Sequence, residues 1–278
     1  MKLRLYQIDA FTDRLFGGNP ACVVPLTKWL PDELLLKIAQ ENAVAETAFF
    51  VPGGEALSGG NTGDDGKMGD NVYGLRWFTP EFEMDLCGHA TLATAHAIKT
   101  ILNHPAEKLV FLSRSGPLEV TEQDGLYTLK FPSRKPRPAP LPDLIRQSLD
   151  RQPVQVLKAR DYVLVYESEA DIRNIKINRQ LLDQINLDPG GIIITAKGSK
   201  SDFVSRFFTP QASIFEDPVT GSAHCTLIPY WSEQLGKKEM VALQLSDRVG
   251  KLYCVDQGES VLISGYAKTY SVGEFWTE

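Results

Sequence analysis

The feature that most constrains the fold is an echo between two distant segments. Arg76-Trp77-Phe78-Thr79-Pro80 returns 130 residues later as Arg206-Phe207-Phe208-Thr209-Pro210. Gly88-His89-Ala90 follows the first run, and Gly221-Ser222-Ala223 follows the second at a distance of 133 residues. Related segments nearly half a chain apart predict duplicated halves rather than a solenoid of short repeats. We place the halves at 1–116 and 117–278, with the last strand a candidate to cross back to the first half.

Both echoes have the same local pattern: a β-rich run, Thr-Pro, a turn, a glycine and an apolar helix. Alanine and aliphatic residues occupy nearly every side of the helix after Gly88, which predicts that it is buried all round. The second helix, from Ser222 to about Leu235, contains Pro229. Because proline has no N–H, the bond to the Cys225 carbonyl should be lost, and we expect a kink.

Alternating and β-rich runs account for most of the rest of the chain. Strands are expected at 3–11, 21–25, 47–51, 74–78, 108–113, 118–121, 127–131, 162–167, 191–196, 202–208, 241–246 and 260–264, and further helices at 31–41 and 179–185. Two buried helices, each wrapped by antiparallel strands, predict an α+β protein of two similar halves. The cleft between such halves is the expected binding site.

Two segments are poor candidates for regular structure. The proline-rich stretch from Pro132 to Pro142 is expected to be a linker or the crossing between halves. The stretch from Gly53 to Gly74 is rich in glycine and aspartate and should form a long surface loop.

Composition excludes several classes of protein. The formal net charge of −6 argues against binding to nucleic acid or an anionic membrane. No apolar run approaches the ~20 residues that span a bilayer, and the N-terminus does not resemble a signal peptide. The four cysteines show no CxxC spacing, so we expect free thiols and a cytoplasmic location.

The two helix starts are candidate anion-binding groups. The first N–H groups of a helix have no partner within the helix and carry partial positive charge, and a glycine lets a ligand approach the backbone closely. Gly88 and Gly221 could each simply permit a tight turn. As a repeated pair beside polar residues, they favour a receptor for a carboxylate.

Polar residues cluster around both glycines. His89 lies at a helix start, where positive charge is disfavoured, so we expect a neutral imidazole that exchanges hydrogen bonds. His224 lies about one turn further along its helix and is interpreted as structural. Asp217 has two open roles, as a cap of the following helix or as a group that binds substrate or handles protons.

Glu46 is the third element of the expected site. It is the single acid in the otherwise apolar run 43–50, at a helix-to-strand transition. Apolar surroundings raise the pKa of a carboxyl group, which suits a general acid or base near neutral pH. The alternative is a strand residue that points into solvent.

Other chemistries lack their usual motifs. The sequence contains no HExxH or CxxC for a metal, no P-loop, no GxGxxG opening a βαβ unit and no GxSxG nucleophile elbow. We therefore expect acid/base chemistry with no metal and no cofactor.

Four motifs together resemble the phenazine-biosynthesis PhzF-like isomerases. They are Asp9-Ala10-Phe11-Thr12…Phe16-Gly17-Gly18-Asn19-Pro20-Ala21, Ala45-Glu46-Thr47-Ala48-Phe49, Arg76-Trp77-Phe78-Thr79-Pro80…Leu86-Cys87-Gly88-His89-Ala90-Thr91 and Glu216-Asp217-Pro218-Val219-Thr220-Gly221-Ser222-Ala223-His224. They occur in the family's order over nearly the whole chain.

The resemblance implies the diaminopimelate-epimerase fold, with two pseudo-symmetric halves that are each a β-barrel-like sheet around a central helix. It also implies that Glu46 shuttles a proton between carbons of the substrate, and that His89, Asp217 and Ser222 line the site. Family members typically form homodimers and need no cofactor, so we expect the same here.

One departure from the wider fold family concerns cysteine. Diaminopimelate epimerases use two cysteines as opposed bases, one before each helix glycine. Cys87 occupies the first position, but Thr220 occupies the second, and its hydroxyl is far too weak an acid to replace a thiol. A symmetric two-cysteine mechanism is therefore not expected.

The leading hypothesis is a proton-transfer isomerase of a small carboxylate-bearing substrate. Glu46, His89 and Asp217 are its expected catalytic residues, and Gly88, Gly221 and Ser222 its substrate-binding residues. One alternative is an epimerase or racemase in which Cys87 participates. Another is a non-catalytic ligand-binding protein on the same scaffold.

Overall fold

The chain forms two compact units. The computed structural model describes residues 1–53, 69–187 and 190–278, so the expected loop at 53–74 lies outside the described residues except at its ends. Unit 1 comprises Met1–Lys130 and Ser264–Glu278, and unit 2 comprises Phe131–Ile263. The chain passes into unit 2 within β8 (Leu126–Pro132) and returns within β17 (Ser260–Gly265). The division into repeats after residue 116 stays a prediction.

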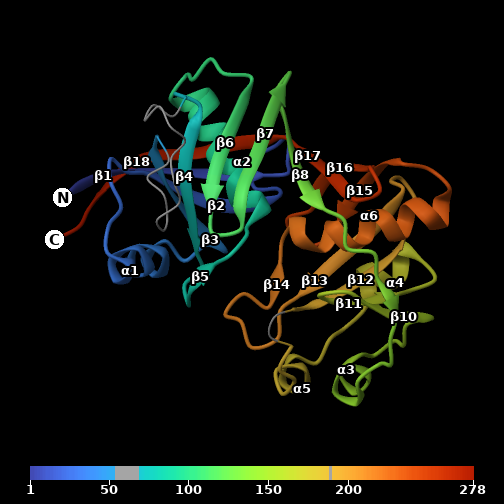
Figure 1. The fold of residues 1–278 in the computed structure, drawn as a ribbon. Coiled ribbons are helices and arrows are strands. Elements are labelled where there is room, and N and C mark those ends of the chain that lie inside the picture. The colour runs from blue at the N-terminus through green and yellow to red at the C-terminus, as the bar shows by residue number, and fades with distance from the viewer. Residues whose placement is uncertain (54–68, 188–189) are drawn as a thin grey trace. The chain divides into compact units, whose positions relative to one another are not determined.

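Unit 1 is a mixed sheet that packs against a buried helix. Its elements are β1 (Lys2–Ala10), β2 (Asn19–Pro25), α1 (Asp32–Asn42), β3 (Glu46–Pro52), β4 (Val72–Phe78), β5 (Glu83–Met84), α2 (Gly88–His96), the π-helical turn η1 (Ala97–Ile101), β6 (Lys108–Ser113), β7 (Gly116–Gln123), β8 and β18 (Ala267–Trp276). β1 pairs antiparallel with both β18 and β2. α2 packs against β1, β2 and β3 (Figure 1).

Unit 2 repeats this arrangement. It contains β9 (Arg137–Pro138), α3 (Asp143–Ser148), β10 (Gln155–Lys158), β11 (Tyr162–Val165), α4 (Glu169–Asn174), α5 (Arg179–Leu182), β12 (Ile192–Lys197), β13 (Phe203–Phe208), β14 (Glu216–Asp217), α6 (Gly221–Leu235), β15 (Glu239–Gln244), β16 (Gly250–Asp256) and β17. β10 pairs antiparallel with β9 and β11, as β1 does with β18 and β2. α6 packs against β15 and β16.

The sheets are mixed, which corrects the expectation of antiparallel strands alone. β2 pairs parallel with β3, and β4 with β6; the matching pairs in unit 2, β11 with β12 and β13 with β15, are parallel too. A parallel pair needs a crossover connection. α1 lies in the connection between β2 and β3, and the buried helices α2 and α6 lie in the connections from β4 to β6 and from β13 to β15.

The repeat extends to single side chains. Arg76 donates two hydrogen bonds to Glu83 at 2.7 and 2.6 Å, and Arg206 donates two to Glu216, both at 2.7 Å. The arginines are 130 residues apart and the glutamates 133, the same offsets as in the sequence echo. In each unit this fork ties a two-residue strand to the strand before it. The molecule is therefore an α+β protein of two pseudo-symmetric halves around central helices.

The central helices are buried, as predicted. Every residue of α2 from His89 to His96 is buried, and so are most residues of α6 as far as Ser232. α6 continues through Pro229. The Cys225 carbonyl, which loses its helical partner there, accepts a hydrogen bond from the backbone N–H of Arg134 at 2.9 Å. The segment after β8 thus supplies the donor that proline lacks.

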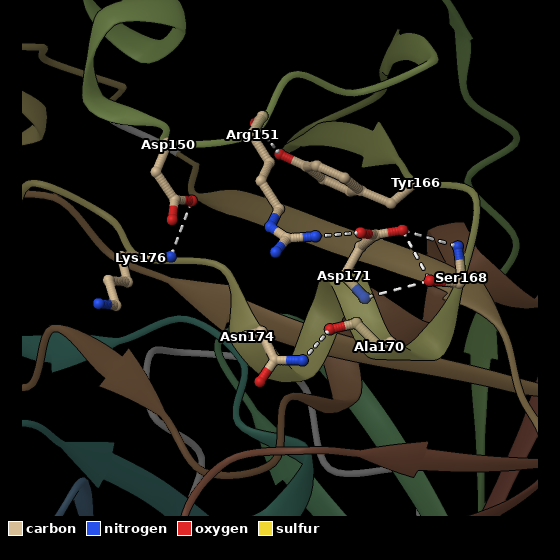
Figure 2. Close-up of polar contacts among 8 residues, drawn as sticks. All are labelled: Asp150, Arg151, Tyr166, Ser168, Ala170, Asp171, Asn174 and Lys176. Carbon is tan, nitrogen blue, oxygen red and sulfur yellow. Dashed lines mark hydrogen bonds and ion pairs between the residues drawn. The ribbon is translucent and has the colours of Figure 1, made fainter.

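Two short elements, β9 and α4, were not predicted from the sequence. β9 lies inside the stretch that was expected to be irregular, where it pairs with β10. α4 begins with a capping box in which the Ser168 hydroxyl accepts from the backbone N–H of Asp171, and the Asp171 carboxylate accepts from the backbone N–H of Ser168. Arg151 contacts the same carboxylate at 2.7 Å (Figure 2). Across the described ranges, no helix is both long and apolar enough to cross a membrane.

Candidate active site

Glu46 is the first residue of β3. α1 ends at Asn42, and Ala43 directly after it has a left-handed φ of 51° that turns the chain towards the strand. Glu46 lies opposite Ala21 of the parallel strand β2. Its side chain is only 14% exposed, and Oε2 lies 3.2 Å from Nε2 of His89. The carboxylate is thus largely withdrawn from solvent, which contradicts the alternative of a solvent-facing strand residue.

His89 is the second residue of α2 and is 3% exposed. Its Nδ1 lies 3.2 Å from the amide nitrogen of Asn19 and 3.5 Å from Sγ of Cys87. Burial lowers the pKa of His89 to about 3, because the charged ring would lose its hydration. The imidazole is therefore neutral near pH 7, as expected. The cause of the lowered pKa is burial rather than the position of His89 at a helix start.

The second group of candidate residues lies in unit 2. Asp217 ends β14, and its Oδ2 accepts a 2.5 Å hydrogen bond from the Thr220 hydroxyl. Gln244 accepts from the Thr220 backbone N–H at 2.9 Å and donates to the Asp217 carbonyl at 2.7 Å. Gln244 is fully buried, so it fixes the turn that carries Asp217. Ser222 follows as the second residue of α6.

Both central helices begin at the expected glycines, Gly88 and Gly221. The residues before them, Cys87 and Thr220, have extended backbones, and neither side chain caps its helix. The Asp217 carboxylate accepts from the Thr220 hydroxyl, one residue before the helix. The N–H groups of the two first turns thus receive no side-chain cap from these positions, as an anion site would require.

The described contacts bring Glu46, Cys87 and His89 together in unit 1, whereas Asp217 and Ser222 lie together in unit 2. That the two groups serve one substrate stays a prediction. His224 is fully buried, and its Nδ1 donates to the Thr220 carbonyl at 2.8 Å. Its ring packs near that of Phe203, which agrees with the structural interpretation.

The unit 1 group also offers metal-ligating atoms. One ligand atom each of Glu46, Cys87 and His89 lies within 4.8 Å of the others, and these donor types suit zinc. However, Sγ approaches Nδ1 of the ring while Oε2 approaches Nε2. A single ion would have to share one ring nitrogen with both other ligands, so this geometry does not fit a metal centre.

Two residues of these groups were not assigned a role from the sequence. Asn19 stands within a recognised motif, but nothing in the motif indicates that its amide reaches His89, 70 residues away. Gln244 ends an ordinary strand, β15, and only the parallel pairing of β15 with β13 brings it to the turn that carries Asp217. Long-range register, which the sequence does not reveal, places both.

Comparison with known proteins identifies the fold class of the chain. The fold is shared by a hydroxyproline epimerase from Agrobacterium vitis, whose structure has a TM-score of 0.60 and covers 98% of this chain and 92% of that one. At 9% identity this likeness shows the fold alone. Within that class, the chain belongs to the phenazine biosynthesis-like protein family (PhzC-PhzF), whose model matches residues 8–273.

Full-length relatives agree with this membership. A protein of Pseudomonas aeruginosa named as an uncharacterized isomerase is 44% identical over 274 residues, which is 98% of each chain. A human phenazine biosynthesis-like domain-containing protein is 36% identical over 91% of each chain. The crystal structure of a PhzF-family protein from Enterococcus faecalis has a TM-score of 0.88 at 40% identity, with complete coverage of both chains. The chain thus belongs to a family in which some members are named isomerases.

Proposed function

We propose that the protein is a cofactor-independent isomerase that moves a proton within a small carboxylate-bearing substrate, with Glu46 as the acid/base. The observation that carries this proposal is the contact between Glu46 and His89. A carboxylate that is 14% exposed lies 3.2 Å from a ring nitrogen of a buried, neutral imidazole. A glutamate that serves only to keep a surface soluble is exposed to solvent, whereas a largely buried carboxylate beside a buried histidine is typical of a functional site.

In the proposed reaction, the Glu46 carboxylate removes a proton from an activated carbon. The resulting carboxylic acid returns that proton to another carbon on the same face of the substrate. One base therefore serves both steps, and no redox chemistry is needed. His89 remains neutral throughout, so it orients the carboxylate and the substrate through hydrogen bonds without competing for the proton.

For the carboxylate of the substrate, we propose the helix starts at Gly88 and at Gly221–Ser222 as binding groups. Their first-turn N–H groups receive no side-chain cap from Cys87 or Thr220, and partial positive charge at helix starts favours anions. Asp217, which the hydrogen bonds of Thr220 and Gln244 hold in place, is proposed to orient the substrate and share in proton transfer.

The test is solvent exchange in heavy water with a panel of cyclohexadiene carboxylates and amino acids, followed by NMR of the recovered compounds. We expect turnover, or deuterium at carbon, for at least one compound with the wild-type protein. Glu46→Gln should abolish both while leaving folding and ligand binding intact. Glu41→Gln, which changes an exposed glutamate of α1, is the matched control and should behave as wild type. Wild-type turnover by Glu46→Gln would refute the role of Glu46.

A second candidate is an epimerase or racemase in which Cys87 acts as a base. The 3.5 Å contact between Sγ and Nδ1 of His89 is the observation in its favour. Cys87→Ala separates the two mechanisms, because only the thiol mechanism needs the sulfur. Unchanged turnover by Cys87→Ala excludes this candidate, and lost epimerisation with intact folding supports it. If ligand binds but no variant or wild type turns it over, the protein is a binding protein.

A further inference from the structure

The motif from Asp9 to Asn19 has no role in the function proposed so far. Its residues form a tight loop between β1 and β2. The Asp9 carboxylate, which is 2% exposed, accepts a 2.9 Å hydrogen bond from the backbone N–H of Phe16. Gly18 has φ of 61°, and a Cβ at this position would lie 2.0 Å from the Ala10 carbonyl oxygen. Only glycine fits at this position, because any side chain would collide with the backbone of Ala10.

This loop delivers Asn19 to His89. Asn19 starts β2 opposite Ala10 and is fully buried. Its amide nitrogen lies 3.2 Å from Nδ1 of His89. Nε2, on the other side of the ring, lies 3.2 Å from Oε2 of Glu46, an electrostatic contact that does not have the geometry of a hydrogen bond. The imidazole is therefore held between an amide and a carboxylate, one on each nitrogen.

The two neighbours determine which nitrogen carries the proton. A neutral imidazole has one N–H donor and one acceptor nitrogen. An ionised carboxylate only accepts hydrogen bonds, so the nitrogen that faces Glu46 must be the donor to avoid repulsion between lone pairs. Nδ1 is then the acceptor, and the NH₂ group of Asn19 is the donor that it requires. The Cys87 thiol at 3.5 Å is a weak donor by comparison.

We propose that Asn19 is a positioning residue of the proton-transfer site: its amide donates to Nδ1 of His89 and so holds the ring in the Nε2–H tautomer, which places an N–H rather than a lone pair beside the Glu46 carboxylate. The effect on catalysis rests on the proposed function, but the tautomer does not. The positive end of an N–H dipole close to a carboxyl group favours its ionised form, whereas a lone pair there favours the neutral form. Loss of Asn19 frees the ring to place its proton on Nδ1, which leaves a lone pair on the nitrogen 3.2 Å from Oε2 of Glu46.

The first measurement needs no substrate. Nitrogen-15 NMR of imidazole-labelled protein distinguishes the two neutral tautomers, and the chain has only four histidines. His89→Gln assigns the ring by its missing signals. We expect the Nε2–H tautomer in the wild type and a shift towards Nδ1–H in Asn19→Leu. Asn174→Leu makes the same chemical change at an exposed site of α4 (Figure 2), where the amide donates to the Ala170 carbonyl; the His89 signals should not change.

Three outcomes overturn the proposal. The first is a wild-type ring that is protonated on Nδ1 or on both nitrogens at pH 7, which requires no variant to fold. The second is an Asn19→Leu protein that keeps the Nε2–H tautomer. The third is a tautomer that changes in Cys87→Ala but not in Asn19→Leu, which would assign the donor to the thiol.

The catalytic consequence has its own readout. With a substrate identified, the acidic limb of the pH profile of kcat/KM should move to higher pH in Asn19→Leu, because a ring lone pair in place of an N–H beside Glu46 favours the neutral form of its carboxyl group. Glu46→Gln must remain inactive for this readout to apply. An unmoved limb in a variant whose tautomer has changed would refute the positioning role. Activity in Glu46→Gln would refute the proposed function and leave the tautomer result standing.

Discussion

Burial of histidine is the main electrostatic feature among single residues. Burial lowers the pKa of His89 to about 3, and lowers those of His96 and His224 to about 4. Lys268 adds a smaller effect at His96, whose Nε2 contacts the Thr269 hydroxyl at 2.9 Å. All three rings are neutral in the folded protein near pH 7, while an unfolded histidine titrates near 6.5.

These shifts predict a pH dependence of stability. Below pH 6.5 the unfolded chain binds more protons than the folded chain, so the free energy of unfolding falls as the pH falls from about 6.5 towards 4. Because one pKa unit corresponds to ~1.4 kcal/mol, each ring contributes at most roughly 3 kcal/mol of this loss. Urea unfolding from pH 7 to 4 measures it. His96→Phe should flatten the curve, and a stability independent of pH in this window would contradict the argument.

At the scale of elements, the paired arginine–glutamate forks offer an internal comparison. Arg76 is 6% exposed and Glu83 10%, whereas Arg206 is 17% and Glu216 23% exposed. Removing one partner of a buried ion pair leaves a desolvated charge and costs roughly 3–5 kcal/mol. Glu83 keeps Arg114 at 2.7 Å, but Arg76 also pairs with Asp32 at 2.9 Å. Arg76→Met should therefore lower the free energy of unfolding by about 3 kcal/mol, the lower end of this range, and Arg206→Met by less. Urea unfolding of both variants tests the order; equal losses would contradict it.

The capping box of α4 is a second test at this scale. The Ser168 hydroxyl accepts from the backbone N–H of Asp171, and the helix has only six residues (Figure 2). Ser168→Ala should destabilise the helix by about 1 kcal/mol. Amide hydrogen exchange within α4 should speed up accordingly. Ser271→Ala, at an exposed position of β18, should leave it unchanged, and unaltered protection in Ser168→Ala would show that packing alone holds α4.

The elements that the sequence predicted are those with a strong periodic signal. β1, α1 and the start of α6 differ from the expected bounds by one residue at their first residue. β18 was missed because its residues are mostly exposed on both faces, so apolar alternation is weak. The Ser168-x-x-Asp171 pattern is typical of a helix start and could have predicted α4. The acceptor role of the Cys225 carbonyl depends on a distant segment, and local pattern does not reveal it.

At the scale of the whole molecule, duplication was predictable and the detail of the site was not. The echo, Glu46 and His89 could be singled out from the sequence because each stands in a motif. The contacts that make them a site, Oε2 to Nε2 and Asn19 to Nδ1, join residues 43 and 70 positions apart. They depend on strand register, which the sequence constrains only weakly. Homodimer formation and a cytoplasmic location stay predictions.

The two duplicated halves differ at the position that Glu46 occupies in unit 1. Phe49 lies opposite Arg76, and Ile194 opposite Arg206. Counted from these paired arginines, the position of Glu46 in unit 1 is that of Gly191 in unit 2. Asp161 binds the backbone N–H of Gly191 at 2.8 Å, and its carboxylate is almost fully buried. Unit 2 therefore carries a glycine whose backbone is held by Asp161, directly before β12, where unit 1 carries a carboxylate.

Gly191 also leaves no room for a side chain. A Cβ there would lie 2.4 Å from Cζ of Phe207 and 2.8 Å from the carbonyl oxygen of Phe208. Because the carbonyl belongs to the backbone of β13, it cannot rotate away. Gly191→Ala should therefore destabilise the protein by about 1–3 kcal/mol through overpacking. Gly273→Ala in β18, where a Cβ meets nothing within 4 Å and φ is not positive, is the matched control and should show no such loss. A Gly191→Ala protein as stable as the wild type would contradict this argument. It would mean that lack of space does not exclude a side chain at the position of unit 2 that corresponds to Glu46, and that the presence of only one such acid needs another explanation.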